Sequence, residues 1–172
     1  HIGHHPGDSL LNLDADMSLG LVLHHLREQR GQSDLMLATG DISNCGSLDS
    51  YRRFADLTEG IAEHSLWLPG NHDLPAYYLP LRYLDPLARF EAFRDLVEQR
   101  LEMDGLAIVP LNTNVPAQPR FNWSKGWITD KALDACLAQI DSLPPRTRVL
   151  VTAHHPLREA GTRGTALTHN GN

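Results

Sequence analysis

The chain has few cysteines, no excess of basic side chains and no long apolar run. Its two cysteines, Cys45 and Cys136, lie far apart and form no C-x-x-C pattern, which is consistent with a reducing, cytoplasmic compartment. Lys and Arg number 15 against 21 Asp and Glu, so no basic field predicts a nucleic-acid or membrane partner. No apolar run approaches a membrane span, and no signal-peptide pattern is visible.

What the sequence does contain is typical of one globular domain. Its 172 residues are 41% hydrophobic and 21% charged, enough to bury a sizeable core, and we expect a single domain over 1–172. Ten histidines are more than a chain of this size usually carries, and they favour metal chemistry. Cys136 falls on the apolar stripe of a predicted helix and is expected in the core, whereas Cys45 is expected in a loop.

Apolar periodicity predicts strands that alternate with helices, hence parallel strands with helical crossovers. A loop is expected over 1–13, and the first helix should carry Leu19, Val22, Leu23 and Leu26 on one face. The helices are expected from Asp14 or Asp16 to about Arg30, over 47–62, from Asp85-Pro86 onward with an apolar side through Val97, and from Thr129 to about Ile140. The strands are expected over 35–39, 65–69, 106–112 and 148–153, and a hairpin-like loop over 121–127.

Polar residues with metal-binding side chains follow three of these strands. The most informative motif is Gly70-Asn71-His72-Asp73, directly after an apolar strand. Gly40-Asp41 follows a second strand, and His154-His155-Pro156 follows a third. Because open α/β sheets place their chemistry at strand ends, these motifs predict a metal site assembled from separate loops.

The motifs GD-x-x-[SN], GNHD and HHP, in this order, resemble those of the calcineurin-like metallophosphoesterases, most closely the bacterial cyclic-nucleotide phosphodiesterase-like branch. The resemblance runs from His1-Ile2-Gly3 to His155-Pro156 and implies an α/β fold, an αββα sandwich of two packed mixed sheets flanked by helices. The family's first motif, D-x-H, would end at His1, and its last, G-H-x-H, would lie beyond residue 172. We therefore expect an internal portion of a larger protein, lacking the first strand and the C-terminal part.

The resemblance implies metal-dependent hydrolysis of a phosphoester, in this branch a phosphodiester, with a metal-bound hydroxide as nucleophile. Two divalent ions roughly 3.5–4 Å apart can neutralise the phosphoryl oxygens and lower the pKa of a bound water. Mixed Asp, Asn and His ligands suit Mn, Fe, Zn, Co or Ni. The partner would be a small phosphoester, and the fold does not select which one.

Each site residue has a functional assignment and a structural alternative. Asp41 is expected to bridge the two ions, Asn71 and His154 to bind one of them, and His1 to bind the other with the preceding aspartate. His72 would donate a proton to the leaving group, while Asp73 orients its imidazole and raises its pKa. The alternatives are a helix cap or turn for Asp41, a turn residue at positive φ for Asn71, a buried structural histidine for His72 and a turn cap for Asp73.

Other polar residues have weaker assignments. His155 would support the site or simply pack, and the aromatic insertion over 74–84 could form a lid or substrate wall. Arg82 and Arg89 could contact substrate charge, although a solvated face is their default. The remaining histidines are His4, His5, His24, His25, His64 and His169. Of these, His4 and His5 are expected to be a solvated pair in a loop. The rival function is a non-catalytic binding or regulatory domain with an incomplete metal site.

Overall fold

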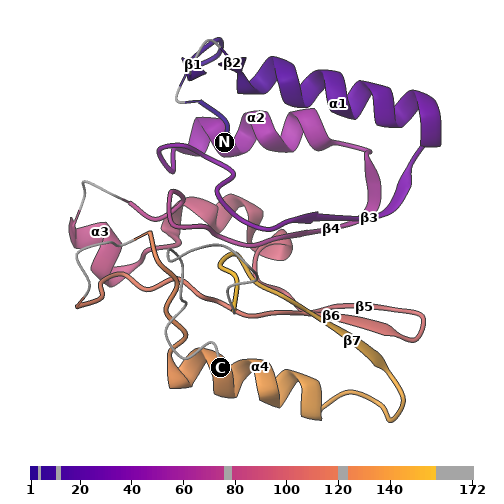
Figure 1. The fold of residues 1–172 in the computed structure, drawn as a ribbon, viewed down its shortest axis with the longest axis vertical. Coiled ribbons are helices and arrows are strands. Elements are labelled where there is room, and N and C mark those ends of the chain that lie inside the picture. Colours follow the sequence, from indigo (N-terminus) through magenta and orange to yellow (C-terminus); the bar gives the residue numbers. More distant parts are fainter. Residues whose placement is uncertain (4, 11–12, 76–78, 120–123, 158–172) are drawn as a thin grey trace, which may run out of the picture.

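The computed structural model describes residues 1–3, 5–10, 13–75, 79–119 and 124–157, and Figure 1 shows its layers. Two sheets lie between helices. The first sheet pairs β3 (Ser33–Ala38) with β4 (Ala62–Trp67), and the second has the order β5 (Leu101–Met103), β6 (Leu106–Pro110), β7 (Arg148–Thr152). The helices α1 (Ala15–Arg30) and α2 (Leu48–Thr58) lie over the first sheet, and α4 (Asp130–Asp141) lies over the second (Figure 1). The predicted αββα arrangement is therefore confirmed.

Three apolar clusters fill the spaces between these layers. Between the two sheets lie Leu66, Leu68 and Ile108, together with Leu35 and Leu37 of β3. The alternate residues of β3, Met36 and Ala38, pack instead in the cluster beneath the helices, as the period of two in a strand requires. The third cluster lies under α4 and includes Val109, Leu111, Ile128 and the buried Cys136, so the core position expected for this cysteine is confirmed.

Strand register brings the three motifs to one edge of the molecule. β3 and β4 are parallel with Ala38 opposite Trp67, so the loops that carry Asp41 and Asn71 leave the first sheet side by side. In the second sheet β6 and β7 are also parallel, and β7 ends at Thr152, two residues before His154. Parallel pairing thus explains why residues distant in sequence meet at the carboxyl ends of the strands.

The helix ends follow the capping residues in the sequence. The side chains of Asp14, Ser47 and Thr129 each accept a backbone N–H at the start of α1, α2 and α4. α1 stops before Gly31, whose φ of 70° ends the helix, as predicted. α2 stops at Thr58, four residues earlier than expected, because Gly60 has a φ of 68° that an α-helix does not allow.

The prediction of an α-helix from Asp85-Pro86 onward is wrong. This segment forms η1, a 3₁₀ helix over Ala88–Leu96 with a kink at Phe93. A 3₁₀ helix superimposes side chains three positions apart on one face. Leu87, Phe90, Phe93 and Leu96 have this spacing, and all four join the cluster around Tyr51 and Trp67.

Several smaller features also differ from the sequence prediction. The segment expected as a loop over 1–13 contains the hairpin of β1 (Ser9–Leu10) and β2 (Leu13–Asp14). The unexpected strand β5 is joined to β6 by Asp104-Gly105, a pair that favours two-residue hairpin turns. Within 74–84 the structure describes the short helix α3 (Leu79–Leu84), whereas residues 76–78, and residues 121–123 of the expected 121–127 loop, lie outside the described part. A lid role for 74–84 stays a prediction.

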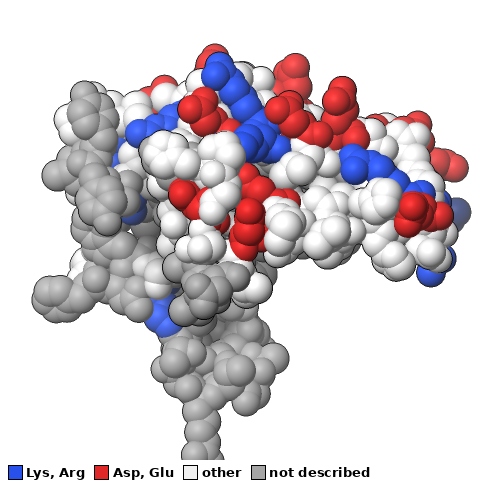
Figure 2. Space-filling view, turned by 90° about the horizontal axis from the view of Figure 1, so that it is seen from above, with Lys and Arg blue, Asp and Glu red and all other residues white. Residues whose placement is uncertain are grey.

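The first helix buries less of its apolar side than expected. Leu23 is 6% exposed, but Val22 is 56% and Leu26 is 39% exposed, so only part of this apolar face is buried. Figure 2 views the molecule from the side of α1 and α2, where acidic and basic side chains are interspersed without a continuous basic patch among the described residues. Within the described residues, none of the helices combines the length and the apolarity needed to cross a membrane.

Candidate metal centre

Asp41 lies at the middle of the site, directly after β3. Gly40 and Asp41 both have positive φ, 106° and 55°, which turns the chain sharply and is uncommon for aspartate. Its Oδ2 is 3.3 Å from Nε2 of His1, and its Oδ1 is 3.5 Å from Nε2 of His154. Oδ1 also accepts the backbone N–H of His72 at 3.0 Å. The carboxylate therefore lies between two imidazoles that come from opposite ends of the chain.

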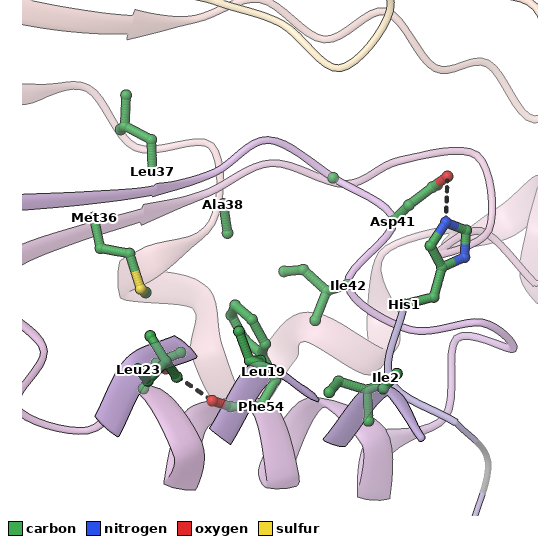
Figure 3. Close-up of a pocket in the computed structure, with 13 residues that line it drawn as sticks. His1, Ile2, Leu19, Leu23, Met36, Leu37, Ala38, Asp41, Ile42 and Phe54 are labelled. Carbon is green, nitrogen blue, oxygen red and sulfur yellow. Dashed lines mark hydrogen bonds and ion pairs between the residues drawn. The ribbon is translucent and has the colours of Figure 1, made fainter. Parts of the chain in front are cut away.

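His1 is held by the backbone that follows it. Ile2, 3% exposed, forms a parallel bridge to Ser43, donating its N–H to Ile42 and accepting from Asn44. Figure 3 shows His1 and Asp41 pointing toward each other at one end of a cavity of about 370 Å³ along β3. The rest of that cavity is mostly apolar, and Leu19, Leu23 and Phe54 face into it.

The imidazole of His154 has a defined tautomer. Its Nδ1 is 2.8 Å from the carbonyl oxygen of Thr39, which only accepts, so Nδ1 carries the proton. In the neutral ring, the lone pair on Nε2 then faces Oδ1 of Asn71 at 3.4 Å and Oδ1 of Asp41 at 3.5 Å. Three acceptors in this arrangement repel one another unless a cation or a proton lies among them.

Two glycines leave the space around these acceptors free. A Cβ on Gly40 would overlap Nδ1 of His154 and lie 2.9 Å from the Cα of Gly70. A Cβ on Gly70 would overlap the Asp41 carboxylate and lie 2.8 Å from Cε1 of His154. The sequence needs glycine at both positions because the two loops and the third motif approach one another this closely.

His72 lies at the exposed side of the site, so the alternative of a buried structural histidine is wrong. Its Nδ1 is 3.3 Å from the carbonyl oxygen of Asn44, and its ring meets that of His1 edge-on at 4.6 Å. One ligand atom from each of His1, Asp41 and His72 lies within 4.8 Å of the others. This spacing is compatible with His72 as a ligand and with His72 as a neighbouring proton donor.

Asp73 differs from its expected position. It is 1% exposed, and its carboxylate accepts hydrogen bonds from the N–H groups of Ile42, Ser43 and Gly70 and from the hydroxyl of Tyr51. Burial raises the pKa of the Asp73 carboxyl, while these hydrogen bonds act in the opposite direction. The carboxylate points into the core and not toward the His72 imidazole, because the inward donors satisfy both of its oxygens.

Both ring nitrogens of His155 have protein partners. Nδ1 is 2.8 Å from Oγ1 of Thr113, and Nε2 is 3.1 Å from the carbonyl oxygen of Ser124. Burial, with the neighbouring His154 imidazole, lowers the pKa of His155 to about 4. A neutral ring that donates at one nitrogen and accepts at the other explains this arrangement and leaves His154 as the member of the pair that faces Asp41.

Two of the remaining candidates are arginines that donate to backbone carbonyls. Arg82 is 4% exposed and its guanidinium donates to the carbonyl oxygens of Pro75 and Pro116, so its expected solvated position was wrong. Arg89 donates to the carbonyl oxygens of Cys45 and Gly46. Cys45 itself is exposed. The other histidines are the exposed His5 and His25, His24 beside Glu28, His64 beside Glu63, and His4 and His169, which lie outside the described residues.

The sequence did not predict three contacts that support the site. The carbonyl of Thr39 orients His154, Thr113 holds His155, and Tyr51 binds Asp73. Only Tyr51 left a signal, since it is a large aromatic residue within the helix expected over 47–62. A backbone carbonyl or a single hydroxyl belongs to no sequence motif. Its hydrogen-bond partners therefore cannot be predicted from the sequence and are known only from the packed structure.

Imidazole nitrogens, a carboxylate and an amide oxygen gathered at strand ends form the donor set of metal-dependent hydrolases. Residues 16–172 match the model of the calcineurin-like phosphoesterase family, and the chain belongs to this family. Members of this family generally use divalent metals, and His1, Asp41 and His72 form one group here that could hold an ion.

The curated relatives give more detail. The chain is 34% identical over 158 residues to a 3′,5′-cyclic adenosine monophosphate phosphodiesterase, CpdA, from Pseudomonas aeruginosa, covering 91% of this chain and 53% of that protein. It is 29% identical over 151 residues to CpdA from Escherichia coli K12, covering 87% and 50%. Glycerophosphodiester phosphodiesterase GpdQ from Enterobacter lignolyticus is 26% identical over 147 residues, covering 84% and 50%. The chain thus spans about half the length of these relatives.

Proposed function

We propose that the intact protein hydrolyses a small phosphodiester at a centre of two divalent metal ions. The observation that carries the proposal is the set of three facing acceptors, Nε2 of His154 with the oxygens of Asn71 and Asp41. Such a set is stable around a cation. His154, Asn71 and Asp41 would hold one ion, and Asp41 with His1 would contribute to the other.

The bound metals would neutralise charge on the phosphoryl oxygens and lower the pKa of a water molecule. The protein residues would hold and orient the two ions. Asp41 has one oxygen toward His1 and the other toward His154, which suits a carboxylate shared by two ions. The Thr39 carbonyl fixes the orientation of His154 and directs its Nε2 into the site.

His72 is the proposed proton donor to the leaving alkoxide. With Nδ1–H directed at the carbonyl of Asn44, the transferable proton of the protonated ring is on Nε2. The exposed position of His72 beside His1 suits a group that must meet a substrate arriving from solvent.

Among phosphodiesters, we propose a cyclic nucleotide as the first substrate to test, because the relatives named above include two cyclic AMP phosphodiesterases. The experiment measures release of product from 3′,5′-cyclic AMP, a glycerophosphodiester and bis(p-nitrophenyl) phosphate by the intact protein. Each substrate is tested after chelation and after addition of Mn²⁺. Metal-stimulated cleavage of at least one of them is expected.

Asp41→Asn tests the role of the site in the same assays. It should abolish the stimulation by metal, since an amide lacks the charge and the second acceptor oxygen of a bridging ligand. Asp34→Asn is the matched control, because Asp34 is exposed on β3, the strand that precedes Asp41. Metal binding without cleavage of any phosphoester would instead support a non-catalytic binding or regulatory domain.

A further inference from the structure

One buried carboxylate joins the two loops that carry Asp41 and Asn71. Oδ1 of Asp73 accepts the N–H of Ser43 at 2.9 Å, and Oδ2 accepts those of Ile42 at 3.2 Å and Gly70 at 2.8 Å. Ser43 and Ile42 follow Asp41, whereas Gly70 precedes Asn71. The position of this carboxylate therefore sets the distance between the two loops.

The hydroxyl of Tyr51 is the side-chain partner of this carboxylate. Tyr51 is 0% exposed, and its Oη is 3.1 Å from Oδ1 of Asp73 and 3.2 Å from the Asp73 carbonyl oxygen. Burial raises the pKa of Tyr51, so the group is a neutral donor. Its ring packs against Phe90 with centroids 4.3 Å apart.

The same helix turn fixes the segment that begins with His1. Oγ of Ser50 donates to the carbonyl oxygen of Gly3 at 2.8 Å, and the guanidinium of Arg53 donates to the same oxygen. The first two turns of α2 thus contact both the His1 segment and, through Tyr51, the clamp at Asp73. Since α2 is packed on the first sheet, it can hold the His1 segment and the two loops that carry Asp41 and Asn71 in fixed positions.

We propose that Tyr51 is a positioning residue of the metal centre, whose hydroxyl acts through Asp73 to hold Asp41 and Asn71 at the spacing that metal binding requires. The inference rests on the proposed metal site and concerns the contacts that determine the affinity of this site for metal ions. Without the hydroxyl, Oδ1 of Asp73 keeps only the Ser43 N–H, while Oδ2 keeps those of Ile42 and Gly70, so the carboxylate is held less firmly between the two loops.

The test is Tyr51→Phe in the intact protein, which removes one oxygen and leaves the ring. The dissociation constant for Mn²⁺ is measured by isothermal titration and should rise about 5-fold, as expected for one lost hydrogen bond that orients ligands. Asp73→Asn should raise it further, by about 10-fold or more. The double variant should bind Mn²⁺ about as Asp73→Asn does, since the two groups act in one chain of contacts.

Two controls separate positioning from general loosening. Phe90→Leu weakens packing against the Tyr51 ring but keeps the hydroxyl, so it should lower the Tm and leave the Mn²⁺ dissociation constant unchanged. Tyr83→Phe removes a hydroxyl from a side chain that is 52% exposed and should change neither quantity. In Tyr51→Phe, hydrogen exchange at the amides of Ile42, Ser43 and Gly70 should also become faster.

A merely structural role for Tyr51 would give a different pattern. Tyr51→Phe would then lower the Tm as Phe90→Leu does, with an unchanged Mn²⁺ dissociation constant, and that result would overturn the inference. Wild-type protein that binds Mn²⁺ but cleaves no phosphoester would overturn the proposed activity alone. The metal titration of the variants decides the role of Tyr51 in either case.

Discussion

The ring nitrogen Nε2 of His154 lies 3.4 Å from the side-chain oxygen of Asn71, although the two residues are 83 positions apart in the chain. Asn71 follows β4 of the first sheet, whereas His154 follows β7 of the second. A contact of this kind spans the interface between the sheets. As the proposed ligands of one ion, the two side chains could serve it only while both sheets keep their packing.

Asn71→Ala should lower metal occupancy and activity together. The change would remove the proposed neutral oxygen ligand of the ion that His154 faces, so we expect a loss of metal affinity of about 10-fold or more. Metal content after dialysis and kcat/KM are the two measurements. Gln99→Ala removes an exposed amide elsewhere and serves as the control. Full metal content in Asn71→Ala would contradict its assignment as a ligand.

His72→Ala should leave the metals bound but slow the reaction, because general acid catalysis contributes roughly 10²–10⁴-fold. The loss should be greatest for alkoxide leaving groups of high pKa and should shrink for p-nitrophenyl esters, which hardly need a proton. Rates with the two ester types, together with metal content, make the test. Equal slowing of both types, or loss of metal as in Asn71→Ala, would contradict the assignment of His72 as the proton donor.

Gly70→Ala should disrupt the site through a single methyl group. The added Cβ would overlap the Asp41 carboxylate and lie 2.8 Å from Cε1 of His154, so the loops must separate. We expect at least about a 10-fold loss of Mn²⁺ affinity. Gly20→Ala, within α1, is the control. The added Cβ would make only an ordinary contact there, with Leu57 of α2 at 3.7 Å. There the substitution should be neutral or stabilising, by up to about 1 kcal/mol.

Glu98 should make the stability fall as the pH rises. Burial raises the pKa of this carboxyl from 4.5 to about 7, and its buried Oε1 has no hydrogen-bond partner among the described residues. Because the pKa is higher in the folded state, the favourable contribution is complete below pH 4.5 and is lost as the pH rises through 7. The resulting loss is about 1–3 kcal/mol.

Glu98→Gln should remove this dependence. Urea unfolding at pH 5 and pH 8 should show a smaller fall in the free energy of unfolding for the variant than for the wild-type protein. Glu63→Gln, at an exposed position of β4, should keep the wild-type fall. An unchanged fall in Glu98→Gln would mean that the carboxyl is ionised in the folded protein at both pH values.

The strands, caps and strand-end motifs could be predicted because each depends on a short stretch of sequence. An apolar run that ends in Gly40 or Gly70 predicts both the strand and the sharp turn after it. The 3₁₀ segment could not be predicted in this way. Leu87, Phe90, Phe93, Leu96 and Val97 contain spacings of three and four, and only packing against Tyr51 and Trp67 decides between them.

In the site, too, features that depend on neighbouring residues could be predicted, whereas features that depend on residues distant in sequence could not. The sequence placed Asp41, Asn71 and His154 at strand ends, and parallel pairing then brought them together. The direction of the Asp73 carboxylate depends on donors from Ile42 and Tyr51, more than 20 positions away. No local pattern records those partners, so its expected contact with His72 was assigned from sequence adjacency alone.

The contact between His154 and the carbonyl of Thr39 closes a loop of 115 residues. Closing a loop of this length is slow and occurs late in folding, because the entropy of the chain opposes it until other contacts have formed. The centre should consequently be among the last parts of the molecule to assemble. A metal ion bound there selects molecules in which both sheets have already docked, so its binding energy adds to the barrier against unfolding.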